Sequence, residues 1–138
     1  MNHMVELELP KDIFEIIVAI FIAWIFYQGL AYATGTSMPI VSVVSESMEP
    51  VLHRGDLLFV VGPNKIDIGD IVIYNRAEVS YTIVHRIINK TDEGYIIKGD
   101  NNPVPDRGFV KGEQIKGEVV FAAPLLGYPR LMLNIFGI

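Results

Sequence analysis

The sequence has 138 residues, of which 51% are hydrophobic and 20% are charged, and its mean hydropathy is +0.38. This length allows one domain and an anchor, and the high hydropathy predicts that some apolar surface faces lipid. The net charge of −5 argues against a nucleic-acid-binding protein, which needs a clustered basic face. The absence of cysteine excludes disulfides, cysteine-ligated zinc and a thiol nucleophile, and three histidines are too few for a His-rich metal site.

The first predicted element is a helix that crosses a membrane. Asp12 and Glu15 form a capping signature ahead of an apolar run, and no residue from 16 to 35 is charged. About 20 apolar residues, at ~1.5 Å each, match a hydrocarbon core about 30 Å thick. Gly35 is placed to end the helix. We therefore expect a polar tail over 1–12, a transmembrane anchor over 13–34 and one β domain over 35–138.

Two other interpretations of the apolar segment are weaker. The run 31–33 (Ala-Tyr-Ala) is similar to a cleavage site for a signal peptide, but such peptides have a basic start and an apolar core of about 7–15 residues. Here Lys11 is surrounded by acids and the core is longer. The remaining chain is too short to bury the segment as a core helix. Because only Lys11 precedes it, the positive-inside rule says little about orientation.

After a linker over 34–39, the sequence predicts a series of short β-strands. Runs rich in β-branched residues alternate with Gly, Pro, Asn and Asp, and they cover residues 56–61, 70–74, 79–88, 95–98 and 118–122. This pattern favours a small, mostly antiparallel β domain. The Gly-Asp pairs at 55–56 and 69–70 predict turns. The apolar tail, 122–138, is equally consistent with an interfacial segment beside the anchor and with a last piece of core.

The stretch 45–50 (Ser-Glu-Ser-Met-Glu-Pro) contains the candidate nucleophile. Its proline restricts the preceding residue to extended or turn geometry, so the two serines lie in a stiff, non-helical segment. A serine hydroxyl is a poor nucleophile until a base accepts its proton. The candidate bases are His53, His85 and a buried lysine.

His85 is the stronger of the two histidine candidates. His53 lies in a turn-like stretch, as solvated histidines often do. In the strand around it, His85 shares one face with Tyr81, Ile83 and Ile87. An apolar face suits a hydrogen-bonded core histidine, and it equally suits a base that desolvation keeps neutral.

The stretch 98–106 supplies two acids that could support such a base. A catalytic imidazole needs an acceptor that fixes its tautomer. Asp100 and Asp106 lie in a loop that Pro103 and Pro105 stiffen. Asp and Asn oxygens would also suit calcium, but their spacing here is not that of an EF-hand loop.

Four stretches in chain order resemble the ordered boxes of type I signal peptidase. They are 45–50, 69–72 (Gly-Asp-Ile-Val), 84–86 (Val-His-Arg) and 98–102 (Lys-Gly-Asp-Asn-Asn) followed by Asp106. Four boxes in the right order are a far more specific signal than any one of them. The bacterial branch has lysine in the third box and uses a Ser-Lys dyad. With His85 there, the chain resembles the archaeal and endoplasmic-reticulum branch.

The resemblance implies a site without any cofactor, on a β-fold of the signal-peptidase and repressor-cleavage type. It assigns a nucleophile, a general base, an orienting acid and an auxiliary acid, which are Ser47, His85, Asp106 and Asp100 in that order. Ser45 falls where the family places an oxyanion-hole hydroxyl, and the Ser47 backbone N–H would be the second donor. Lys98 would be a rival base only if the bacterial mechanism applied.

On this resemblance we expect a membrane-bound serine endopeptidase that removes N-terminal signal peptides from exported preproteins. The catalytic domain would lie on the extracytoplasmic side of the cell membrane or the endoplasmic-reticulum membrane. Expected partners are signal peptides, the lipid bilayer and accessory or export-machinery subunits, but no nucleic acid. Met48, Val51 and the tail would face lipid.

Two alternatives remain open. The first is a self-cleaving Ser-Lys protease of the repressor type, against which the anchor and His85 count. The second, from another class, is a non-enzymatic membrane-tethered β module of a protein-export complex.

Overall fold

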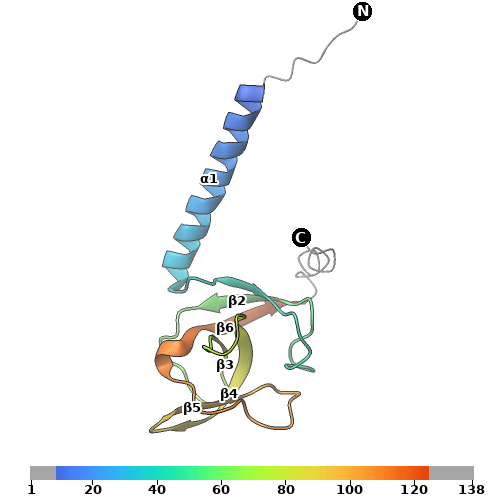
Figure 1. Ribbon diagram of the computed structural model, residues 1–138, viewed down its shortest axis with the longest axis vertical. Coiled ribbons are helices and arrows are strands. Elements are labelled where there is room, and N and C mark those ends of the chain that lie inside the picture. The colour runs from blue at the N-terminus through green and yellow to red at the C-terminus, as the bar shows by residue number, and fades with distance from the viewer. Residues whose placement is uncertain (1–8, 125–138) are drawn as a thin grey trace, which may run out of the picture.

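Helix α1 (Leu9–Thr34) leads into a single β domain in the computed structural model, which describes residues 9–124 (Figure 1). The helix begins three residues before the expected cap at Asp12. Pro10 explains the difference, because a proline in the first turn has no N–H that the helix would need to satisfy. The residues from Pro10 to Thr34 are long and apolar enough to cross a membrane, and none of this stretch is buried by the protein. Within residues 9–124, this excludes a buried core helix.

The end of α1 is fastened to the sheet. Gly35 adopts a left-handed conformation with φ of 73°, as expected of a helix-ending glycine. The Gly62 N–H donates to Thr34 O at 2.7 Å, and the Thr36 hydroxyl donates to Lys116 O at 2.8 Å. A Cβ on Gly62 would lie 2.5 Å from Gly35 O, so a glycine is required for this approach.

Six antiparallel strands form one sheet in the spatial order β1-β2-β6-β3-β4-β5 (Figure 1). The strands are β1 (Ile40–Ser42), β2 (Leu57–Val61), β3 (Ile71–Tyr74), β4 (Ile83–Thr91), β5 (Gly94–Lys98) and β6 (Ile115–Ala123). A short 3-10 helix, η1 (Gly112–Gln114), precedes β6. The predicted antiparallel β domain is confirmed, and the strand that comes last in the described chain lies in the middle of the sheet.

Two details of the predicted strands were wrong. The residues from 79 to 82 are not in a strand, because Tyr74 pairs with Ile83 and residues 75–82 must turn the chain between β3 and β4. The strand continues instead to Thr91. The three-residue β1 was not predicted, since it is too short to show a period of two. The predicted turns at Gly55 and Gly69 are confirmed, with φ of 96° and 98°.

The sheet separates two small cores. The Leu58 core consists of Val43, Met48, Leu52, Leu58, Val60 and Ile73. The Ile97 core consists of Val72, Tyr74, Ile87, Ile97, Val110 and Ile115. Neighbours along β3 therefore face opposite cores, as a period of two requires.

The three expectations about lipid contact have different outcomes. Met48 is fully buried in the Leu58 core, so the expectation that it faces lipid was wrong. Val51 is half exposed, and its contact with lipid stays a prediction. The expectation for the apolar tail falls mainly on residues 125–138, which lie outside the described residues.

Candidate active site

The candidate nucleophile lies on a turn between β1 and β2. The Val51 and Leu52 N–H groups both donate to Met48 O, at 3.0 and 2.9 Å. The Met48 side chain fills the Leu58 core, and this anchors the turn on which Ser47 lies. A residue beside a buried anchor has little freedom to move, so the position of the Ser47 hydroxyl is fixed.

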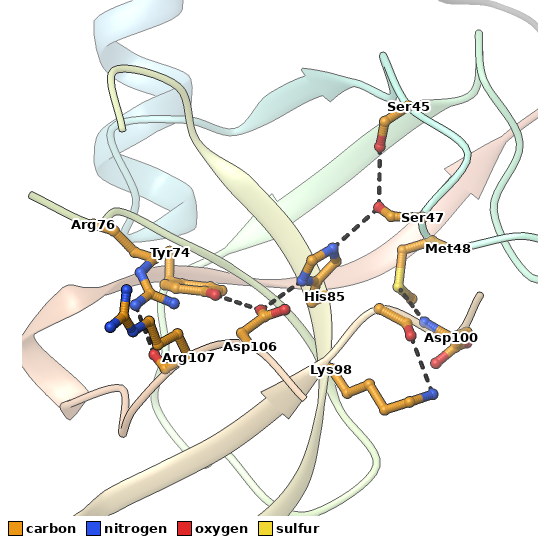
Figure 2. A network of polar contacts seen from close by, with 11 residues as sticks. Ser45, Ser47, Met48, Tyr74, Arg76, His85, Lys98, Asp100, Asp106 and Arg107 are labelled. Carbon is orange, nitrogen blue, oxygen red and sulfur yellow. Dashed lines mark hydrogen bonds and ion pairs between the residues drawn. The ribbon is translucent and has the colours of Figure 1, made fainter. Parts of the chain in front are cut away.

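His85 lies on β4 with its ring between Ser47 and the loop after β5 (Figure 2). Its Nε2 is 3.0 Å from Ser47 Oγ, and its side chain is 11% exposed. Ile83 and Ile87, two residues away on either side, pack with the Ile97 core, whereas Val84 packs with the Leu58 core. The predicted face of His85 is confirmed within the strand, although Tyr81 lies before it and is 65% exposed.

Asp106 completes a hydrogen-bonded series. Its Oδ2 is 2.6 Å from His85 Nδ1, and its backbone N–H donates to Ile97 O at 2.7 Å. Because an ionised carboxylate only accepts hydrogen bonds, Nδ1 carries the imidazole proton. The other nitrogen, Nε2, is then free to accept the proton of the Ser47 hydroxyl.

The charge of Asp106 is maintained by its neighbours. Burial alone would raise the pKa of the Asp106 carboxyl, but hydrogen bonds from His85 and Tyr74, together with the positive charge of Arg76, lower it overall. The carboxylate is therefore ionised at neutral pH.

The structure adds Tyr74 to the site, a residue that sequence reasoning missed. The Tyr74 hydroxyl donates to Asp106 Oδ2 at 2.5 Å, and the ring is fully buried. The sequence presents Tyr74 as an ordinary apolar strand residue. The available signal was its period-two relation to Val72, which pairs with His85, but this required the register of β3 against β4.

Asp100 does not reach His85 but forms an ion pair with Arg86. The Arg86 Nε donates to Asp100 Oδ1 at 2.9 Å and Nη2 donates to Asp100 Oδ2 at 2.9 Å. Arg86 also donates to Gly69 O, at 2.6 Å. Asp100 thus contacts a fixed cation on the other face of β4, while Asp106 contacts the imidazole.

The loop after β5 is hydrogen-bonded directly to the turn that carries Ser47, called here the nucleophile turn. The Asn101 N–H donates to Ser47 O at 2.9 Å, and the Asn101 side chain donates to Glu46 O at 3.1 Å. A Cβ on Gly99 would lie 2.7 Å from Ser47 O and 2.9 Å from His85 Nε2. Only glycine leaves space for both groups, so this residue sets how closely loop and turn approach.

The remaining sequence candidates are placed as follows. Ser45 Oγ lies 3.0 Å from Ser47 Oγ, so its hydroxyl is beside the nucleophile (Figure 2). The Lys98 ammonium donates to Gly99 O at 3.3 Å. His53 is more than half exposed and lies 3.9 Å from Asp56. The distances therefore favour His85 as the partner of Ser47.

A cleft of about 1050 Å³ adjoins Ser47, His85 and Asp106. Its walls come from three segments, within the ranges 41–48, 74–85 and 102–110, with Gln114 beside them. Apolar side chains such as Val41 and Ile83 are part of its lining. Among residues 9–124, no three His, Cys, Asp or Glu side chains gather as a metal ion would require. The cleft can hold an extended peptide against a serine, and the series of hydrogen bonds suits acyl transfer.

Similarity to known proteins agrees with this geometry. Residues 16–120 match the Peptidase S24-like family. The chain is 39% identical to the signal peptidase complex catalytic subunit SEC11 of Pyricularia oryzae, over 81% of this chain and 73% of that protein. Identity to the SEC11 subunit of Verticillium alfalfae is 38% with the same coverage, and to that of Saccharomyces cerevisiae (strain YJM789) it is 39% over 81% and 75%. The chain therefore belongs to the Peptidase S24-like family and, within it, to the type I signal peptidases of the endoplasmic-reticulum branch.

Proposed function

We propose that Ser47, His85 and Asp106 form the catalytic triad with which this membrane protease removes signal peptides from exported preproteins. The observation that carries the proposal is the unbroken series of contacts, 3.0 Å from Ser47 to His85 and 2.6 Å from His85 to Asp106. The series opens into the cleft, where an extended substrate has access to the serine.

In the first half of the reaction, Ser47 Oγ attacks the scissile carbonyl carbon while His85 Nε2 takes the hydroxyl proton. The imidazolium that forms keeps its Nδ1–H bond to Asp106, whose negative charge stabilises it. When the tetrahedral intermediate collapses, the C–N bond breaks and His85 returns the proton to the leaving amine. This amine is the new N-terminus of the mature protein, and the signal peptide stays on Ser47 as an ester.

The second half releases the signal peptide. A water molecule enters the cleft, His85 Nε2 takes one of its protons, and the oxygen attacks the ester carbonyl. The C–O bond to Ser47 breaks, and the serine oxygen recovers the proton from His85. The signal peptide leaves with a new carboxyl group, which gives its remaining proton to solvent water, and the site returns to its starting state.

Ser45 supplies one donor to the developing oxyanion. Its hydroxyl lies beside the nucleophile oxygen and can rotate to donate, and the Ser47 backbone N–H is the second donor. Asp100 has the auxiliary role, acting through Arg86 to hold the loop that carries Asp106.

The anchor explains how the protease meets its substrate. A segment over 13–34 spans the bilayer, and the chain continues through β1 into the nucleophile turn. The domain, which begins at residue 35, lies on the extracytoplasmic side. A preprotein whose apolar signal is held in the same membrane thus presents its cleavage site near the cleft. The relatives are named as catalytic subunits of a signal peptidase complex, which supports accessory subunits for this chain as well.

The test is cleavage of a synthetic preprotein by the full chain, both in membranes and in detergent. We expect one cut, located by mass spectrometry, after a small residue. Ser47→Ala and His85→Ala should each abolish it, and the double variant should be no slower than either, because the residues act as one unit. His53→Ala is the matched control and should cleave normally. A non-enzymatic β module would lose nothing with Ser47→Ala, and that result would overturn the proposal.

A further inference from the structure

We propose that Tyr74 is a positioning residue of the triad, because its hydroxyl fixes the Asp106 carboxylate through the same oxygen that accepts from His85. The inference rests on the proposed function of the triad. Tyr74 lies outside the four sequence boxes, at the end of β3, whereas His85 lies on β4.

The first support is the geometry at Asp106. Two donors converge on its Oδ2, the Tyr74 hydroxyl at 2.5 Å and His85 Nδ1 at 2.6 Å (Figure 2). They come from the neighbouring strands β3 and β4, which pair residue by residue from Ile71 to Tyr74. The carboxylate oxygen is therefore held between two points of one rigid ladder.

The second support is that Asp106 itself lies on a loop. Loops vary in position more than the strands that they connect, and the terminal torsion of an aspartate side chain has a broad minimum. A single donor would leave the carboxylate free to rotate about its Cβ–Cγ bond. A second donor on the same oxygen, from another strand, limits that rotation. The orientation of the carboxylate is then fixed by the paired strands of the sheet, although Asp106 itself lies on a loop.

The third support is that Tyr74 remains a donor. Burial raises the pKa of the Tyr74 phenol, and the hydrogen bond to Asp106 and the charge of Asp106 raise it further. The phenol therefore keeps its proton throughout the neutral range. The charged and titratable groups that face Asp106 are His85 from β4, Tyr74 from β3 and Arg76 from the segment after β3.

The test compares Tyr74→Phe with Tyr95→Phe. Both changes remove one hydroxyl, and both rings pack in the Ile97 core, but Tyr95 is only partly buried there and lies on β5. We expect Tyr74→Phe to lower kcat on the preprotein by about tenfold to a hundredfold, as for a hydrogen bond to a charged group. KM should stay within about twofold, because the Tyr74 hydroxyl contacts the acid and not the substrate. Tyr95→Phe should match the wild type.

A double-mutant cycle separates positioning from a general structural effect. In an Asp106→Ala background, Tyr74→Phe should cost less than about twofold, since its target is gone. An equal cost in both backgrounds would overturn the proposal. So would a wild-type kcat for Tyr74→Phe.

A measurement without substrate makes the contact testable on its own. In protein labelled with carbon-13 at aspartate carboxyls, the Asp106 signal is identified by its loss in Asp106→Ala. We expect it to titrate at higher pH in Tyr74→Phe than in the wild type or in Tyr95→Phe, because a donor that lowers the pKa is missing. An unchanged titration overturns the proposal. A wild-type chain that cuts no preprotein overturns the proposed function instead, and the titration then decides the contact alone.

Discussion

The two faces of β4 contact different residues of the same loop, the one that follows β5. On one face His85 contacts Asp106, and on the other Arg86 contacts Asp100, so adjacent strand residues each bind one acid of the segment after β5. The imidazole can lose and regain a proton, whereas a guanidinium stays charged at every working pH. Two aspartates six positions apart thus differ in their partners. In the proposed mechanism, the His85–Asp106 pair takes part in proton transfer, and the Arg86–Asp100 pair acts only as a clamp that holds the loop.

The largest expected effect is the loss of kcat on replacing Asp106, and it tests whether the two acids differ in role. Asp106→Asn should lower kcat by up to about 10⁴-fold, because the imidazole loses both its tautomer control and its countercharge. Asp100→Asn should lower it far less. Rate constants for both variants on one preprotein, with circular dichroism to check folding, decide the matter. If Asp100→Asn lowers kcat more than Asp106→Asn does, Asp100 is the orienting acid and Asp106 the auxiliary one.

The next largest effect is expected on replacing His85, the proposed general base. His85→Lys should lower kcat by about a thousandfold, within the usual range for loss of a general base. A lysine beside the Asp106 carboxylate would form an ion pair, which favours its protonated form and removes its basicity. The measurement is a pH–rate profile from neutral to alkaline pH. Activity near that of the wild type at neutral pH would mean that the pocket suits a Ser-Lys mechanism.

A smaller effect is expected at Gly99, where the loop approaches both halves of the site. Gly99→Ala should lower kcat by about tenfold to a hundredfold, since the new methyl group would lie 2.9 Å from His85 Nε2 and displace the ring. Gly112→Ala is the control, because nothing lies within 4 Å of its Cβ position. Equal activity of the two variants would show that loop and turn can separate without cost.

Loss of the Arg86–Asp100 ion pair should lower the stability of the protein more than its kcat. Asp100→Asn should lower the free energy of unfolding by about 1 kcal/mol, since the pair has two good hydrogen bonds but is partly exposed to solvent. Thermal unfolding of the wild type and the variant measures it, with Asp92→Asn as a control on a turn. No difference in Tm would remove the proposed role of the clamp.

The smallest expected effect is the acid dependence of stability. The folded-state pKa of Asp106 is lowered, so the carboxylate contributes stability above its unfolded pKa, and this is lost as pH falls through the folded value. The Tm of the wild type should therefore fall more steeply below about pH 4 than that of Asp106→Asn. Parallel Tm curves for the two proteins would contradict the lowered pKa.

Local pattern was enough to predict the anchor and most of the sheet. The span depends on composition over some twenty neighbouring residues, and the strands on alternation over five, so both can be found without knowing the fold. Residues 79–82 were misassigned because the strand-like pattern of residues begins inside the β3–β4 turn, before that turn ends at Ile83. That point depends on the pairing of Tyr74 with Ile83, which is not local.

The same distinction applies to the site. Ser47, His85, Asp100 and Asp106 were all identified as candidates from the ordered boxes, but the sequence does not show which residue of β4 each acid contacts. Sequence reasoning proposed Asp106 as the orienting acid and left Asp100 with an undefined auxiliary role. Its pairing with Arg86 required the strand faces, and the contact of Tyr74 required the register. Contacts between segments far apart in sequence were the part that the sequence alone could not provide.

The central position of β6 has a consequence for when this protease becomes active during its own synthesis. Strands β1 and β2 carry the nucleophile turn, and β3 to β5 carry the base and the loop of the acid. Among the described strands, these two groups join into one sheet only through β6, which pairs with β2 on one side and β3 on the other. Because the ribosome delivers the chain from its N-terminus, Ile115–Ala123 emerges after all three residues of the proposed triad. A half-made chain, already held in the membrane by its anchor, would therefore have all its reactive groups but no assembled site, and it could not cut its neighbours prematurely.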